Sequence, residues 1–63
     1  MKRFECMLSH STERCAAVII TNAETLGKGV RVRIRGIDWE VKAAIPASTN
    51  KVQFGDIIHE VRK

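Results

Sequence analysis

The pattern of apolar and charged positions over residues 30–41 predicts a β-hairpin. Arg35 and Gly36 serve as a two-residue turn, so that the two arms face each other residue by residue. Apolar residues oppose each other on one side of the hairpin, in the pairs Val30 with Val41, Val32 with Trp39 and Ile34 with Ile37. Opposite charges meet on the other side, in the pairs Arg31 with Glu40 and Arg33 with Asp38. Both sets of pairs specify the same register.

Two further strands are predicted before the hairpin. Residues 3–8 alternate between apolar and polar positions, which is the period of a half-buried strand. Residues 15–21 form a short apolar run that ends in β-branched side chains, and this composition favours a strand buried on both sides. The alternative is a helix that starts near Ser11, because apolar residues over 15–26 also recur at helical spacing.

Turn-forming residues indicate how these strands are connected. Residues 22–27 suit one helical turn, with Asn22 as its N-cap and Gly27 as its stop. The alternation of the hairpin's second arm continues to Ile45. Pro46 ends it, because proline has no N–H to donate to a neighbouring strand. A loop is therefore expected after Pro46.

The C-terminal residues 51–63 predict a bent or broken fifth strand. Val52 and Phe54 alternate with polar residues before a Gly-Asp pair, and apolar residues resume at Ile57. The alternative is a final helical turn that is capped by Asp56.

Five short strands separated by turns predict a mainly β protein with a single domain over residues 1–63. The expected architecture is a small five-stranded barrel or a strongly bent sheet, of SH3-like or OB-like type, with the hairpin at its centre. The two helical alternatives allow this fold to include one short helix, in residues 11–26 or at the C-terminus.

A second apolar face indicates a partner. If the first two strands pair, alternate residues of both enter the core, namely Phe4, Cys6, Leu8, Cys15, Ala17 and Ile19. The opposite face is also apolar and contains Met7, Ala16, Val18 and Ile20. Small soluble proteins rarely expose such a patch. We therefore expect it to be covered by residues 22–27, by a C-terminal helical turn, by a second copy in a homodimer, or by a partner protein.

Positive charge indicates a second kind of partner. The 63 residues include 11 Lys and Arg against seven Asp and Glu, a net charge of +4, which favours nucleic acid or an acidic protein surface. The residues expected to form a basic stripe along a phosphate backbone are Lys28, Arg31, Arg33, Arg35 and Lys42. Because Asp38 and Glu40 oppose two of the arginines, the charges expected to stay unpaired are Lys28, Arg35 and Lys42.

The three aromatic side chains, Phe4, Trp39 and Phe54, are all expected in the core, because they share the apolar phase of their strands or have apolar neighbours. Proteins that bind single-stranded nucleic acid use exposed aromatic side chains on which bases stack. Any binding is therefore expected to depend on the phosphate backbone and to be weakly specific.

No cluster of residues predicts catalysis or a metal site. The candidate soft ligands are Cys6, His10, Cys15 and His59, and their spacings match no usual zinc arrangement. The sequence Ser9-His10-Ser11 is a polar turn without a third residue to orient the histidine. An enclosed active site is not expected in a chain this short. We expect no enzyme activity, no metal, no cofactor and no small-molecule substrate.

The remaining expectations concern location and function. No signal-peptide apolar region follows the N-terminus, and the longest apolar run, residues 15–20, is far shorter than the roughly 20 residues of a membrane span. We expect a cytoplasmic protein with free thiols at Cys6 and Cys15 and no membrane partner. Its predicted function is that of a small binding module whose basic hairpin contacts nucleic-acid backbone. The alternative is a small adaptor or inhibitor, of the kind that phages and mobile elements encode, which docks on a larger protein through an apolar or basic surface.

Overall fold

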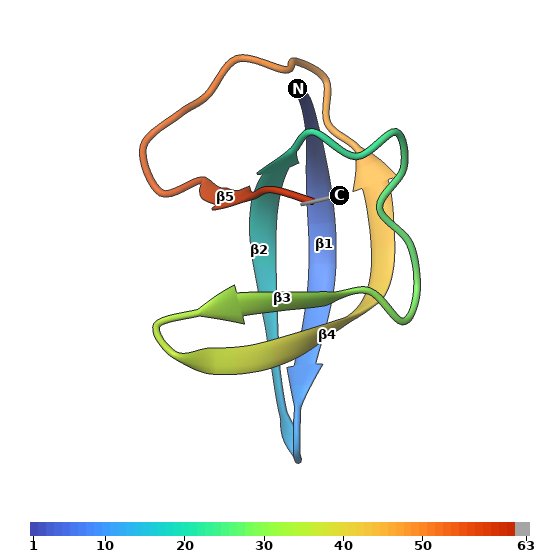
Figure 1. The fold of residues 1–63 in the computed structure, drawn as a ribbon, viewed down its shortest axis with the longest axis vertical. Helices are drawn as coiled ribbons and strands as arrows, with labels where there is room; N and C mark the ends of the chain where they lie inside the picture. The colour runs from blue at the N-terminus through green and yellow to red at the C-terminus, as the bar shows by residue number, and fades with distance from the viewer. Residues whose placement is uncertain (62–63) are drawn as a thin grey trace.

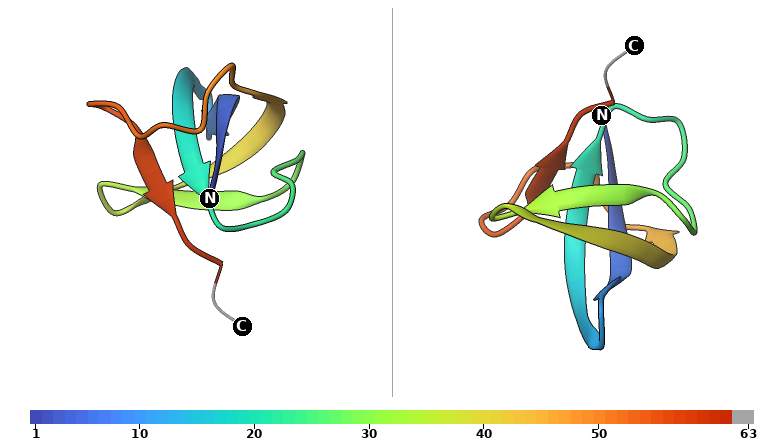
Figure 2. Two further views of the ribbon diagram at one scale, coloured as in Figure 1. Left: turned by 90° about the horizontal axis from the view of Figure 1, so that it is seen from above. Right: turned by 60° about the horizontal axis from the view of Figure 1, so that its bottom comes forward.

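Five strands and no helix form in residues 1–61, the part of the chain that the computed structural model describes (Figure 1). The strands are β1 (Lys2–His10), β2 (Glu13–Thr21), β3 (Arg31–Ile34), β4 (Ile37–Pro46) and β5 (Ile57–His59). All belong to one sheet with the order β3-β4-β1-β2-β5. The sheet is strongly curled, and its two end strands, β3 and β5, approach each other (Figure 2). The prediction of a small, mainly β barrel is confirmed, but the β3–β4 hairpin lies at one end of the sheet and not at its centre. The same residues contain no helix long and apolar enough to cross a membrane.

The β3–β4 hairpin has the predicted register. Its four opposed pairs are those expected from the sequence, with Val32 opposite Trp39 near the middle. The turn residues Arg35 and Gly36 both have positive φ angles, of 52° and 82°. This mirror-image turn follows the right-handed twist of the two strands, and glycine adopts it without the steric cost that Arg35 incurs.

β1 and β2 form a second hairpin, so residues 15–21 are a strand and the helical alternative is wrong. Phe4 lies opposite Ile19 and Leu8 opposite Cys15, so these side chains share one face of the sheet. We call this the inner face, and we call the opposite side, which carries Met7, the outer face.

A β-bulge in β4 changes which residues face inward. Lys42 is an extra residue between Val41 and Ala43, which pair with consecutive residues of β1. The predicted alternation up to Ile45 is therefore wrong, because the bulge shifts the phase of the strand by one residue. Ala44 packs against the core, and its two neighbours lie on the outer face.

β5 is short and runs parallel to the end of β2, with Ile57 opposite Ile19. A broken fifth strand is thus confirmed, and a final helical turn is wrong. Asn22 extends this pairing, because its side chain donates to the Val61 carbonyl at 3.3 Å and accepts from the Val61 N–H at 2.8 Å. The expected helical turn over residues 22–27 is absent from the structure, since Asn22 bonds to the C-terminal segment.

The core lies inside the curled sheet and is made of side chains from five segments. Its buried members are Phe4, Cys6, Leu8, Ile19, Leu26, Val32 and Val41. Leu26 comes from the connection between β2 and β3, which closes one end of the barrel.

Replacement of Leu8 tests this core. Leu8 is fully buried, so we expect Leu8→Ala to lower the free energy of unfolding by about 2–5 kcal/mol, through lost apolar burial and the cavity that remains. The control is Met7→Ala, on the outer face and 46% exposed, which should cost less than about 1 kcal/mol. Urea unfolding followed by Trp39 fluorescence measures both. Equal losses would contradict the assignment of the two faces.

Candidate nucleic-acid interface

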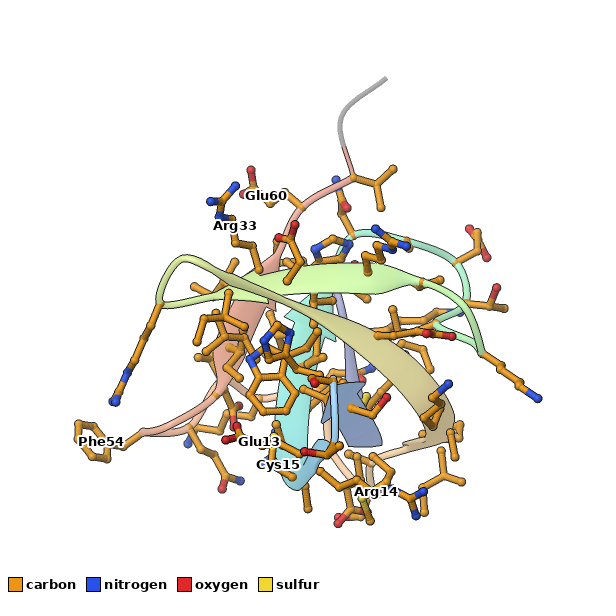
Figure 3. All side chains as sticks on the ribbon, turned by 90° about the horizontal axis from the view of Figure 1, so that it is seen from below. Glu13, Arg14, Cys15, Arg33, Phe54 and Glu60 are labelled. Carbon is orange, nitrogen blue, oxygen red and sulfur yellow. The ribbon has the colours of Figure 1, made fainter. Side chains whose placement is uncertain are left out.

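The predicted basic residues are exposed on or beside the β3–β4 hairpin; they are Lys28, Arg31, Arg33, Arg35 and Lys42. We call residues 28–42 the basic hairpin. Arg31 and Arg33 alternate with the buried Val32 along β3 and therefore share its outward side. Arg35 lies in the turn, and Lys42 is the bulged residue of β4. Figure 3 shows Arg33 on the hairpin with its side chain directed away from the core.

Glu40 of the basic hairpin does not form its ion pair with the residue that lies opposite it in the strand register. Glu40 lies opposite Arg31, as predicted, but its carboxylate contacts the Lys42 ammonium at 3.3 Å. Up to Val61, no carboxylate lies within ion-pair distance of Arg31. The expectation that Lys42 stays unpaired and Arg31 is paired is therefore wrong, because Glu40 contacts the lysine two residues along its own strand and not the arginine opposite.

The remaining pair in the hairpin is weak. The Arg33 Nε lies 3.9 Å from the Asp38 Oδ1, and the two side chains are 72% and 58% exposed. Exposed pairs of this kind contribute between zero and about 1 kcal/mol to stability and are screened by salt. Arg33 can therefore exchange Asp38 for another anion at little cost.

The positive charge of the protein is concentrated in the basic hairpin. Its five cationic residues and two carboxylates leave +3, whereas the whole chain carries +4. The other six cations and five carboxylates nearly cancel. A polyanion that approaches the protein is therefore attracted mainly to this hairpin.

A groove of about 820 Å³ lies beside the hairpin, along an open edge of β2. β5 covers β2 only at Ile19–Thr21, so residues 13–18 have no strand partner on that edge in the described part of the chain. The groove is lined by Cys15 and Ala17 of β2 and by Ile34 and Trp39 of the hairpin, among other residues. Phe54 and its neighbours stand at the end of the groove next to β5.

Phe54 is fully exposed at 108%, so the prediction that it belongs to the core is wrong. It sits in a turn where the Asp56 N–H donates to the Gln53 carbonyl at 3.1 Å and Gly55 has a φ of 94°. The Gly-Asp pair after Phe54 was the available signal for this turn. Phe4 is buried as expected, and Trp39 is half-buried with its ring 5.5 Å from that of His10.

A buried ion pair holds this turn against β1. The Arg3 Nε donates to the Asp56 Oδ2 at 2.9 Å, and only 12% and 4% of the two side chains are exposed. The Gln53 N–H donates to the same carboxylate at 2.9 Å. The hydrogen bonds from Arg3 and from the Gln53 backbone lower the pKa of Asp56 below its ordinary value. We call the hydrogen-bonded group of Arg3, Gln53 and Asp56 the brace. Arg3 is far from the other two residues in the sequence, and nothing in the spacing predicts their contact.

The predicted apolar interface is divided by this arrangement. Met7 and Ala16 are exposed and Val18 is half-buried, whereas Ile20 is fully buried. Ile20 lies opposite Arg3, to which residues 47, 50 and 56 are hydrogen-bonded. The outer face thus keeps an exposed apolar patch of Met7, Ala16 and Val18, to which the bulge adds Ala43 and Ile45.

The candidate metal ligands do not gather in one place. Cys6 and Cys15 are free thiols, and residues 1–61 contain no group of three or more side chains arranged to hold a metal ion. Burial raises the pKa of the Cys6 thiol above its ordinary value, which disfavours the reactive thiolate.

Comparisons of this chain with models of protein families, with curated proteins and with solved structures find no match.

The brace predicts a specific dependence of stability on pH. Because the pKa of Asp56 is lower in the folded than in the unfolded protein, its contribution is complete above the unfolded value of about 3.9 and is lost as the pH falls through the folded value. We expect Asp56→Asn to be less stable than the wild type at pH 7, and the difference to shrink between about pH 5 and pH 2. Urea unfolding at several pH values measures this difference.

Asp38→Asn provides the control, because the Asp38 pair is exposed and should contribute little at any pH. A stability difference for Asp56→Asn that is the same at pH 7 and pH 3 would contradict the role given to the ionised carboxylate.

Proposed function

We propose that the protein is a small, non-enzymatic binding module that contacts nucleic-acid backbone through the basic hairpin. One observation carries the proposal: residues 28–42 hold three of the four net positive charges of the chain. Within this segment, Lys28, Arg31 and Arg35 have no carboxylate within ion-pair distance among the described residues. They are the cations that a phosphate backbone meets first.

The geometry suits phosphate contacts better than the reading of base edges. Arg31 and Arg33 stand two residues apart on one side of β3, and Arg35 follows in the turn. Guanidinium groups bind phosphate oxygens in a bidentate manner, and each phosphate that is neutralised releases counterions. With about three such contacts, the logarithm of affinity should fall with the logarithm of salt concentration with a slope of roughly −2 to −3.

Charge reversal in the hairpin tests this function. We expect Arg31→Glu and Arg35→Glu each to weaken binding to a labelled oligonucleotide severalfold at low salt and to reduce the salt slope by about one. Fluorescence anisotropy over a range of salt concentrations measures both quantities. Arg14→Glu is the matched control, because Arg14 is an exposed arginine of β2 outside the basic hairpin. An equal effect of all three changes would attribute binding to net charge alone, and an absence of retention at low salt would overturn the proposal.

A second candidate function is favoured by the apolar patch of the outer face. Met7 and Ile45 are 46% and 61% exposed there, and Ala16 and Val18 extend the patch onto β2, whose outer edge is partly open. Such a surface suits docking on another protein or on a second copy. In this case the protein acts as a small adaptor or inhibitor, and the arginines contact an acidic protein surface.

The oligomeric state of the protein tests whether the partner in the second function is a second copy of the chain. If a second copy covers the patch, the wild type should elute as a dimer in size-exclusion chromatography with light scattering, and Ile45→Glu should elute as a monomer. Val52→Glu is the control, since Val52 is 56% exposed and lies outside the patch. Most specific assemblies have a dissociation constant below about 10⁻⁴ M. A wild type that stays monomeric at all concentrations up to that value would therefore exclude the homodimer.

A further inference from the structure

Phe54 is the most exposed of the large apolar side chains in residues 1–61, and hydrogen bonds hold the backbone turn that carries it. The ring is 108% exposed, although the turn that carries it is held by four hydrogen bonds to or from Asp56. Two of these come from Arg3, whose pairing with Asp56 is almost buried. An aromatic ring on a braced turn loses little conformational freedom when a flat partner packs against it. Figure 3 shows the ring directed away from the protein.

The braced turn and the basic hairpin border the same groove. Phe54 and Ile34 both line it, and Ile34 stands between Arg33 and Arg35 in the sequence. The turn of the hairpin and the turn before β5 project from the same side of the barrel (Figures 1 and 2). A polyanion that contacts Arg35 in the turn of the hairpin is therefore on the same side of the barrel as the exposed aromatic ring.

We infer that the nucleic acid bound by the basic hairpin is single-stranded and that Phe54 stacks on one of its bases. This inference rests on the proposed function. The bases of a duplex are already stacked on one another, so only an unpaired base offers its face to the ring. Every base has such a face, so the contact selects for strandedness and tolerates sequence. An exposed ring and a cationic hairpin turn on the same side of the barrel favour a nucleic-acid strand over an apolar protein segment, which would leave the guanidinium groups without anionic partners.

The test compares single-stranded and double-stranded binding. The probe is a fluorescein-labelled oligothymidylate of about 12 nucleotides, with the same oligonucleotide annealed to its complement as the duplex, measured by anisotropy at one low salt concentration. We expect the wild type to prefer the single strand. Phe54→Ala should weaken single-strand binding about 5- to 150-fold, the range that corresponds to one base–aromatic stack. Its binding to the duplex should not change.

Two matched variants separate stacking from general apolar contact. Phe54→Trp should keep single-strand affinity, because a tryptophan ring also stacks. Val52→Ala alters an exposed apolar residue of the same segment and should behave as the wild type. Both Phe54 variants should have wild-type unfolding midpoints in urea, since the ring has no buried contacts to lose.

The outcomes distinguish this inference from the function on which it rests. If the wild type binds neither probe, the basic hairpin is not a nucleic-acid site, and the proposed function and the inference both fail. If the wild type binds both probes equally and Phe54→Ala matches it, the hairpin binds phosphate and only the stacking inference is overturned. Equal loss of single-strand and duplex binding in Phe54→Ala also overturns it, because stacking on an unpaired base cannot act on a duplex.

Discussion

The pairing of β1 along both of its edges is the constraint on which the sheet depends. β2 occupies one edge and β4 the other, so the alternation of side chains on β1 decides which residues of both neighbours face inward. A shift of one residue in either register would move a whole set of apolar side chains to the other face. Lys42 makes this shift once, within β4. The same strand thereby supplies Val41 to the core and Ile45 to the outer face.

The register of the β3–β4 hairpin could be predicted because two independent patterns agree on it. The β3–β4 register satisfies apolar pairing on one face and charge pairing on the other, and only one alignment does both. The bulge at Lys42 could not be predicted in this way, since a lysine suits an exposed position in either phase and the extra residue exists only relative to β1. Phe54 was misplaced because its neighbours are apolar, whereas its position depends on Asp56 and on the distant Arg3.

Register constrains backbone pairing more strongly than it constrains surface charge. Arg31 and Glu40 are opposed in the ladder, yet Glu40 contacts Lys42, because exposed long side chains choose among partners that differ little in energy. The residues of the candidate site could therefore be predicted from the sequence. Which of their charges form ion pairs could not. Structure adds what spacing cannot: a braced aromatic turn and a charged hairpin on either side of one groove.

The parallel contact between β2 and β5 also determines the order in which the barrel can be completed. The β1–β2 and β3–β4 hairpins each join neighbouring segments through two-residue turns, so their pairing needs only short loops to close. β5 meets β2 across most of the chain, and closing so large a loop gains its contacts only when the earlier strands are in place. Until then the whole outer edge of β2 is free, and Ile19 lacks the side chain of Ile57 beside it. We therefore expect the β2–β5 pairing to form last, when it shortens the open edge of β2 from its nine residues to the six that stay open in the finished barrel.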